Sequence, residues 1–400
     1  MSDKKKLGRA TRLVHMGRNH ADHPAFVNPP LERGSTVLFP TVAMRNATRE
    51  RPFDQVLSYG LKGGPTHFHL EDAIAEIEGG TRCQIVSTGL AAVTTALFAY
   101  VKNGRHGLFP DTVYGPTRNF LTGMGTDCGM EFTFYPPDID EAGLRALMRD
   151  NTTMIYCESP GSHTMEMQDV PMLSRIAKDV GVKLVMDNTW GFSLFAPFEH
   201  GVDCSIQAAT KYIGGHSDVM LGAITTNSDS DYERVRTVST SLGHFASPDD
   251  CWLALRGLRT LNVRLRAHMQ AGLRVAGWLR EQPEVAQVLH PGLPDTPGHE
   301  IWKRDFTGAC GLFSVELTPD YSYDDMVAMI DGLQLFGIGA SWGGYESLVL
   351  PVTGAITRTA DQKSAERLMF RLHIGLEDTD DLIADLKNGL KLLQQHAAKR

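Results

Sequence analysis

From about residue 66 to residue 226, the chain alternates short β-rich runs with stretches of helical periodicity. The run 182–186 is apolar except for Lys183, which is typical of a strand buried on both faces. Because strands that alternate with helices pair in parallel, this pattern predicts an α/β fold with a mostly parallel, seven-stranded sheet and helices on both sides. The predicted strands are 83–86, 106–109, 131–135, 153–158, 183–187, 204–208 and 221–226.

The pattern changes on either side of this unit. The first sixty or so residues are rich in Pro, Gly and Arg and have little periodicity. They predict an extended arm with one short helix that packs on something else, such as a partner subunit. A long helical stretch covers 251–280. A second mixed unit follows, with predicted strands at 311–317, 347–352 and 368–374 and helices at 323–335 and 379–395. We therefore predict an arm at 1–63, an α/β domain at 64–259 and a smaller α+β domain at 260–400.

Composition excludes several classes of protein. The 400 residues carry 39 Lys and Arg against 47 Asp and Glu, a net charge of −8, so neither nucleic acid nor an anionic membrane is expected as a partner. No apolar run approaches the roughly 18–20 residues that span a bilayer. Residues 1–6 have no apolar segment behind them, so no signal peptide and a cytoplasmic location are expected.

Cysteine and histidine spacing gives no metal site. The six cysteines are scattered without a Cys-x-x-Cys pair, so buried, reduced thiols are expected. His67-Phe68-His69 has a spacing that suits a metal, but no acidic or cysteine cluster completes a site. We therefore predict no metal and interpret these histidines as residues at the start of a helix.

Polar residues follow the ends of three predicted strands, the place where open α/β sheets bind ligands. After the first strand comes a turn whose Gly89 lets the backbone approach an anion at a helix N-terminus. Asp187 ends an apolar strand, and Thr210-Lys211 follows the next strand. Taken singly, each has an ordinary alternative: a plain turn, an Asx-type cap or a surface lysine.

Taken together, the three features match the needs of one cofactor, pyridoxal 5′-phosphate. Its phosphate suits the helix N-terminus at Gly89, its pyridine nitrogen suits a carboxylate such as Asp187, and its aldehyde suits the amine of Lys211. A lysine that is desolvated in a cleft has a lowered pKa and a free amine that attacks a carbonyl.

Two later features add to this set. Tyr114 follows a predicted strand, where its ring suits stacking on a pyridine ring, with a half-buried core tyrosine as the alternative. Arg371 interrupts a strand-like apolar run, and the segment 341–347 accompanies it as a candidate. A buried arginine needs an anionic partner, which is either a substrate carboxylate or an internal Asp or Glu.

Several stretches of the chain together resemble one family. They are Tyr59-Gly60, Thr66-His67-Phe68, Glu158-Ser159-Pro160-Gly161-Ser162, Met186-Asp187-Asn188-Thr189-Trp190, Ala208-Ala209-Thr210-Lys211-Tyr212, Ser341-Trp342-Gly343-Gly344-Tyr345 and Arg371-Leu372-His373-Ile374-Gly375. The resemblance is to the Cys/Met-metabolism family of fold-type I pyridoxal-phosphate enzymes, and to its β-lyases in particular. It covers nearly the whole chain and implies the aspartate-aminotransferase-like fold.

The resemblance implies roles for the cofactor site. Lys211 would bind the cofactor covalently and later move protons, Asp187 would pair with the ring nitrogen, and Tyr114 would stack on the ring. The phosphate would be held by the remaining members of the set, which are Gly89, Leu90, Thr210 and Tyr59 of a neighbouring subunit. Catalysis would thus involve Lys211, Tyr114 and Tyr59, in a homotetramer of two active-site dimers.

The resemblance also implies a substrate site. Arg371 would bind the α-carboxylate with help from Ser341, and Trp342 would narrow the pocket and favour chemistry at the β-carbon. The family's β-lyases usually carry two arginines where this chain has Leu61 and Lys62, and an acidic residue where it has Asn119. Lys62 would partly replace the missing charge, and both departures bear on the distal end of the substrate.

The implied reaction is cleavage of L-cystathionine to homocysteine, pyruvate and ammonia. Alternatives within the family are a γ-lyase acting on cystathionine or methionine and a cysteine desulfhydrase. Two other classes remain, an aminotransferase of the same fold and a non-catalytic protein that binds the cofactor.

Overall fold

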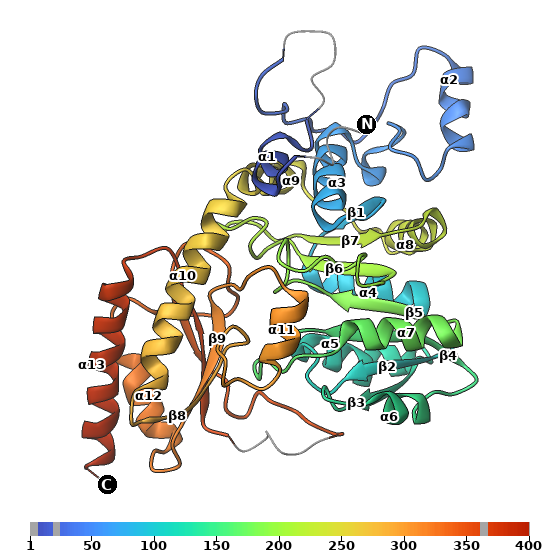
Figure 1. Cartoon of the computed structure of the whole chain (residues 1–400). Helices are drawn as coiled ribbons and strands as arrows, with labels where there is room; N and C mark the ends of the chain where they lie inside the picture. The colour runs from blue at the N-terminus through green and yellow to red at the C-terminus, as the bar shows by residue number, and fades with distance from the viewer. Residues whose placement is uncertain (1–6, 19–24, 361–366, 400) are drawn as a thin grey trace.

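The computed structural model describes residues 7–18, 25–360 and 367–399. Its larger sheet has seven strands in the order β1-β7-β6-β5-β4-β2-β3 (Figure 1). As described, this sheet has a single strand, β7, that runs antiparallel to its neighbours, so the predicted mostly parallel sheet is confirmed. The strands are β1 (Arg82–Val86), β2 (His106–Pro110), β3 (Glu131–Tyr135), β4 (Thr152–Glu158), β5 (Lys183–Asp187), β6 (Cys204–Ala208) and β7 (Gly222–Thr226).

Helices cover both faces of this sheet because its strands are apolar on both sides. In β5, Leu184 and Met186 contribute to one core and Val185 to another. The first core is closed by α3 (Pro65–Glu78), α6 (Glu141–Ala146) and α7 (Val170–Val180). The second is closed by α4 (Gly89–Tyr100), α5 (Gly115–Phe120) with its continuation Leu121–Gly125, and α8 (Asp229–Ser241).

A smaller sheet, in the order β10-β11-β12-β9-β8, follows in the sequence. Phe370 and Leu372 of β12 pack into a core with helices, whereas Arg371 and His373 alternate with them on the opposite face of the strand. That face therefore carries the polar side chains toward the larger sheet. The elements are α11 (His299–Asp305), β8 (Val285–Leu289), β9 (Leu312–Leu317), α12 (Tyr323–Asp331), β10 (Gly337–Ile338), β11 (Leu348–Pro351), β12 (Met369–His373) and α13 (Thr379–Ala397).

The predicted helical stretch 251–280 is two helices, α9 (Pro248–Leu258) and α10 (Leu261–Arg280). Next to this break α9 lies so close to the loop after β6 that a Cβ at Gly257 would lie 2.4 Å from the Ile213 carbonyl oxygen. The predicted helix 323–335 was too long. It ends at Asp331 because the N–H groups of Gln334 and Leu335 donate to the Asp385 carboxylate instead.

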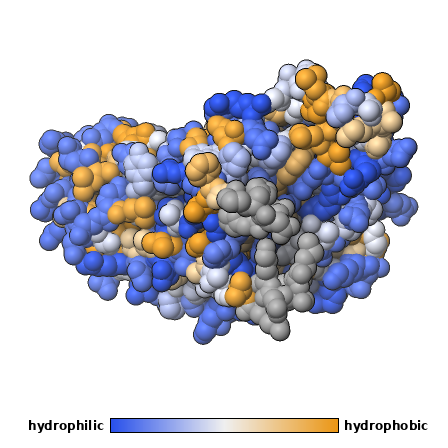
Figure 2. Space-filling model, turned by 90° about the horizontal axis from the view of Figure 1, so that it is seen from above, coloured by the Kyte–Doolittle hydropathy of each residue, from blue (hydrophilic) through white to orange (hydrophobic). Residues whose placement is uncertain are grey.

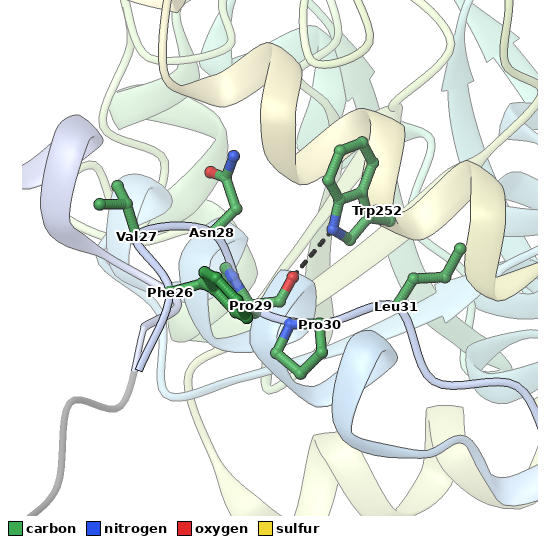
Figure 3. Close-up of a pocket in the computed structure, with 7 residues that line it drawn as sticks. All are labelled: Phe26, Val27, Asn28, Pro29, Pro30, Leu31 and Trp252. Carbon is green, nitrogen blue, oxygen red and sulfur yellow. Dashed lines mark hydrogen bonds between the residues drawn. The ribbon is translucent and has the colours of Figure 1, made fainter. Parts of the chain in front are cut away.

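The arm holds more short helix than predicted. Its elements are α1 (Arg9–His15), α2 (Val42–Ala47) and the 3₁₀ turns Thr48–Glu50 and Gly60–Lys62. Phe26 is 88% and Leu38 90% exposed, and Figure 2 shows hydrophobic residues exposed on this side of the molecule. The segment 26–31 lines a pocket against Trp252, whose Nε1 donates to the Pro29 carbonyl (2.9 Å; Figure 3). The domain boundaries after 63 and 259 stay a prediction.

Five expectations concern features away from the sheets. Among the residues described, no helix is long and apolar enough to cross a membrane, and no cluster of three or more His, Cys, Asp or Glu side chains could hold a metal. His67 lies at the start of α3, where Nδ1 accepts from the Gly64 N–H. All the cysteines are free, and Cys128 is the exposed one. Residues 1–6, on which the signal-peptide expectation rests, lie outside the described residues.

Candidate active site

The predicted strand-end residues meet at one edge of the larger sheet. Strands β1, β2, β5 and β6 run in the same direction, so their carboxyl ends lie together. The residues that follow these ends are Gly89 and Leu90 after β1, Tyr114 after β2, Asp187 at the end of β5, and Thr210 and Lys211 after β6. We call this region the carboxyl edge.

Gly89 begins α4 and is packed against β6. A Cβ at this position would lie 2.6 Å from the Cβ of Ala208, which is closer than packed carbons allow. The Thr88 side chain accepts from the Ala91 N–H, and the Thr88 carbonyl accepts from the Ala92 N–H. The amides of Gly89 and Leu90 precede these and have no intrahelical acceptor, so they form an anion-binding helix N-terminus.

Thr210 has a second task besides the predicted one. Its hydroxyl accepts from the Leu221 N–H (3.0 Å) and donates to the Leu221 carbonyl (3.2 Å). This hydroxyl therefore ties the loop after β6 to the start of β7. To donate to a phosphate, it must rotate its hydrogen away from Leu221.

Lys211 is half-buried and held by the segment 341–344. Its Nζ donates to the Ser341 hydroxyl and lies 5.5 Å from the centre of the Trp342 ring. Burial, with the charge of Arg371 as a second cause, lowers the pKa of Lys211 to about 8, and Asp187 opposes this shift. A large share of this amine is therefore neutral near pH 8.

Arg371 reaches the same segment from the smaller sheet. Its guanidinium Nη2 donates to the Ser341 carbonyl (3.0 Å), and among the described residues no carboxylate forms an ion pair with it. Burial lowers the pKa of Arg371 to about 10, while Tyr114 raises it. The internal Asp or Glu partner left open by the sequence is thus not found in the described chain, and the guanidinium is available to an incoming carboxylate.

Two acids stand side by side at the carboxyl edge. Glu158 and Asp187 are partners in the register of β4 and β5. Burial raises the pKa of Asp187, although the Thr189 N–H donates to its Oδ1 (3.0 Å) and Lys211 lowers it. Burial, and then the charge of Asp187, raises the pKa of Glu158 to about 8. Both groups therefore hold a proton more strongly than an exposed carboxyl does.

Tyr114 is 43% exposed at the start of α5. Its backbone N–H donates to Glu158 Oε2 (2.7 Å). Burial, Asp187 and Glu158 raise the pKa of its phenol, and Arg371 opposes this. The ring is therefore partly open and its hydroxyl keeps its proton at neutral pH.

Three predicted residues are not joined to this group. Tyr59 is 55% exposed in the arm, and Asn119 is exposed on α5. The Lys62 carbonyl accepts from Arg236 (2.6 Å). Within the described chain, no hydrogen bond, ion pair or ring contact links these three side chains to Lys211, Asp187 or Arg371.

Sequence reasoning missed Glu158 and His373. Glu158 ends a strand as Asp187 does, so the rule that selected Asp187 would also have selected it. His373 lies two residues after Arg371, on the same face of β12, and its Nε2 contacts the Gly343 N–H (3.2 Å) and the Gly344 carbonyl (3.0 Å). The alternation of polar and apolar residues in β12 was the available signal.

The arrangement fits pyridoxal phosphate on grounds that the structure itself supplies. The amides of Gly89 and Leu90 form a cradle that any Cβ at Gly89 would disturb. Lys211 is an amine of lowered pKa at the same edge. Asp187 is a half-buried carboxylate for which no basic side chain forms an ion pair among the described residues. Anion cradle, amine and unpaired acid are the groups that this cofactor requires.

An amine, an acid and an anion cradle lie at one edge of the larger of two sheets. This arrangement defines a class of cofactor-dependent enzyme, and a family model identifies the class. The model of the Cys/Met metabolism PLP-dependent enzymes matches residues 10–391. The chain belongs to this family, has its fold-type I architecture and has pyridoxal phosphate as its cofactor.

Individual relatives are similar over nearly their whole length. Cystathionine beta-lyase MetC of Escherichia coli is 41% identical over 97% of this chain and 99% of its own. The cystathionine beta-lyase of Haemophilus influenzae is 39% identical over 96% and 98%. An L-alanine/L-glutamate racemase of Wolbachia pipientis is 38% identical over 95% and 96%. The crystal structure of metB from Corynebacterium glutamicum has a TM-score of 0.89 and 29% identity, and the match covers 98% of this chain and 100% of that one.

Proposed function

We propose that the chain is a carbon–sulfur β-lyase that cleaves L-cystathionine with water to homocysteine, pyruvate and ammonia. The observation that supports this most directly is the double contact on Ser341, whose hydroxyl accepts from Lys211 and whose carbonyl accepts from Arg371. A base and a carboxylate-binding group are thereby held by the same residue. The similarity to the cystathionine beta-lyases of Escherichia coli and Haemophilus influenzae supports the choice of substrate.

The cofactor would be held by residues of the carboxyl edge. Gly89 and Leu90 donate their amides to the phosphate, joined by the Thr210 hydroxyl after it turns from Leu221. Asp187, as its carboxylate, would pair with the protonated ring nitrogen, and the charge of that pair would offset the burial that raises the pKa of Asp187. The phenol ring of Tyr114 would stack on the cofactor ring.

When bound, pyridoxal phosphate supplies an electron-accepting ring that stabilises negative charge on the substrate α-carbon. Arg371 binds the α-carboxylate bidentately and so fixes which bond faces Lys211. The Nζ of Lys211, neutral for a large share of the time near pH 8, removes the α-proton. The carbon–sulfur bond then breaks at the β-carbon, and Lys211, which has taken the α-proton, can return it to the leaving sulfur.

Trp342 supports cleavage at the β-carbon rather than the γ-carbon. Its ring packs edge-on against Tyr212 (5.5 Å between centres) and lies over the Lys211 amine. A bulky, fixed ring beside the base limits how far a longer substrate arm can bend back toward it.

The assembly and location are part of the same proposal. Tyr59, exposed on the arm, would contribute to the phosphate site of a second copy, and two such dimers would form a homotetramer in the cytoplasm. Lys62 and Asn119 would face the distal end of the substrate. The exposed apolar side chains of the arm support a second copy as their partner.

Product analysis on L-cystathionine with added pyridoxal phosphate tests the proposal. We expect equal amounts of pyruvate and homocysteine, and none from a Lys211→Ala control. Formation of 2-oxobutyrate and cysteine would instead identify a γ-lyase. Sulfide release from cysteine, with cystathionine untouched, would identify a cysteine desulfhydrase.

Racemisation is a second candidate, favoured by the Wolbachia relative at 38% identity. It shares the first step, removal of the α-proton by Lys211, but breaks no carbon–sulfur bond. Incubation with L-alanine and chiral analysis of the product separates the two activities, since a β-lyase needs a leaving group that alanine lacks.

A further inference from the structure

The carboxyl edge has two neighbouring acids, and the proposed function uses one of them. Glu158 ends β4 directly beside Asp187 in the strand register. Its side chain is buried, with the residue 8% exposed. Among the described residues, no Lys, Arg or His forms an ion pair with it. A buried acid without a basic partner is costly to ionise, so its hydrogen bonds decide whether it can carry a charge.

Hydrogen bonds, rather than a salt bridge, hold this carboxylate. Oε2 accepts from the Tyr114 backbone N–H (2.7 Å), and Oε1 accepts from the Ser162 hydroxyl (2.7 Å). Tyr114 follows β2, whereas Ser162 follows β4, so one side chain ties two loops of the edge together. The backbone that carries the Tyr114 ring is thereby fixed relative to Asp187.

We propose that Glu158 is a positioning residue of the cofactor site: its carboxylate fixes the backbone of Tyr114, and its charge beside Asp187 strengthens the binding of a protonated ring nitrogen there. This inference rests on the cofactor site of the proposed function. It adds a second negative charge to the one that the family resemblance assigns to Asp187.

The charge contribution depends on pH, and several groups act on it. The charge of Asp187, on β5, raises the pKa of Glu158, and Lys211 in turn lowers the pKa of Asp187. Tyr114 lies near both Glu158 and Arg371, whose charges shift the pKa of its phenol in opposite directions. On the strand and loop of Glu158 itself, Cys157 and Ser162 adjoin it. Glu158 is neutral below its folded pKa of about 8 and ionised above it, so its electrostatic effect grows as pH rises through that value.

The test measures binding of pyridoxamine 5′-phosphate, which has an amine in place of the aldehyde and forms no bond to Lys211. Dissociation constants are compared for wild-type apoprotein and Glu158→Gln from pH 6.5 to 9.5. Glutamine still offers an oxygen to the Tyr114 N–H but has no charge. The ratio of the two constants cancels the titration of the ligand. We expect this ratio to rise to about tenfold at high pH, the effect of a one-unit change in proton affinity.

A ratio that stays constant with pH would overturn the proposal, whether that constant is one or larger, because a purely structural role has no reason to follow ionisation. Ser162→Ala gives a second check. It keeps the carboxylate and removes one donor, so the pKa of Glu158 should rise and the pH at which cofactor binding changes should rise with it. Unchanged behaviour in Ser162→Ala would count against the proposal.

Controls separate this inference from the assignment beneath it. If Asp187→Asn leaves pyridoxamine 5′-phosphate binding unchanged, the cofactor site itself is wrongly placed. If Asp187→Asn weakens binding and Glu158→Gln gives a constant ratio, the inference alone fails. Glu131→Gln, on the exposed start of β3 where Glu131 pairs with Arg149 (3.2 Å), loses the same charge and should give a ratio near one throughout.

Discussion

The carboxyl edge and the arm differ in what surrounds their side chains. At the edge, Lys211 and Arg371 both bond to Ser341, so charged groups from two sheets are held by contacts within one chain. In the arm, Leu13 of α1 and Met16 just after it reach the core of the same chain, but Phe26 is 88% and Leu38 90% exposed. The edge is thus held by contacts within one chain, whereas the exposed apolar side chains of the arm have few such contacts.

This contrast predicts where substitutions act. Changes at the edge should alter binding and chemistry while the fold stays intact. Changes in the arm should leave the stability of the isolated chain alone and alter association. The following predictions test the contrast, from the largest effect to the smallest.

Lys211→Ala should lower the rate of pyruvate formation at least about 10³-fold, because it removes a general base together with the amine that holds the cofactor. The residue is half-buried and lies outside the apolar cores, so the unfolding temperature of the apoprotein should change little. Rates with saturating cofactor and a thermal melt check both statements. Activity above about one tenth of wild type would remove Lys211 from the mechanism.

Arg371→Leu should raise KM about 100-fold, since loss of a buried bidentate carboxylate partner costs about 2–5 kcal/mol. Steady-state kinetics on L-cystathionine give the measurement. Arg367→Leu is the matched control. Arg367 precedes β12, pairs with Glu316 (3.3 Å) and should leave KM unchanged. Equal effects in both variants would contradict a substrate role for Arg371.

The pH dependence of kcat should show a rise through about pH 8, the pKa of Lys211. Burial lowers this pKa and the amine acts as base only when deprotonated, so activity increases with pH and is lost below pH 7. In Arg371→Leu, measured at saturating substrate, the midpoint should move upward because a neighbouring cation is gone. Leu38→Ser, in the exposed part of the arm, should keep the wild-type midpoint, and a shift in this variant would break the separation between the two regions.

Gly89→Ala should weaken cofactor binding about tenfold. The new Cβ, 2.6 Å from the Ala208 Cβ, pushes the start of α4 away from β6 and displaces the amide cradle, and overpacking of this kind costs about 1–3 kcal/mol. Absorbance titration of the apoprotein with pyridoxal phosphate measures it. In Gly123→Ala, where nothing lies within 4 Å of the added carbon, affinity should stay at the wild-type value.

Leu38→Ser should change the unfolding free energy of a dilute sample by less than about 0.5 kcal/mol, because the side chain is exposed. The same substitution should weaken association, as seen by sedimentation at several concentrations. A loss above about 1 kcal/mol in the dilute sample would mean that Leu38 has a core within its own chain. An unchanged association constant would place its partner elsewhere.

Much of the larger sheet could be predicted because local pattern and burial agree. Strands β5 and β6 have the predicted bounds, and Asp187 and Lys211 lie at their ends as expected. The reversed direction of β7 could not be predicted, because a buried strand has the same composition in either direction. The contact of α9 with the loop at 213–214 could not be predicted either, because that loop is distant in sequence from Gly257.

The sequence predicted which residues form the site better than it predicted the contacts between them. Residue type and spacing selected Arg371, but they gave no indication that its resting acceptor is a backbone carbonyl. Ser341 was expected to help bind the substrate carboxylate. The structure places its hydroxyl on Lys211, because a positive φ (+78°) turns this residue back toward the base. Partners of this kind depend on how two sheets meet, which no local pattern records.

The bond between Arg371 and the Ser341 carbonyl has a consequence for selectivity. In the resting protein one nitrogen of the guanidinium donates to a neutral backbone acceptor, so a ligand that uses this nitrogen must offer something better. A carboxylate does, because its two charged oxygens pair bidentately with the guanidinium, whereas the carbonyl is a single neutral acceptor. A simple amine without a carboxylate does not, and it leaves the arginine where it was. Competition from the Ser341 carbonyl thus favours ligands that carry a carboxylate over amines that lack one.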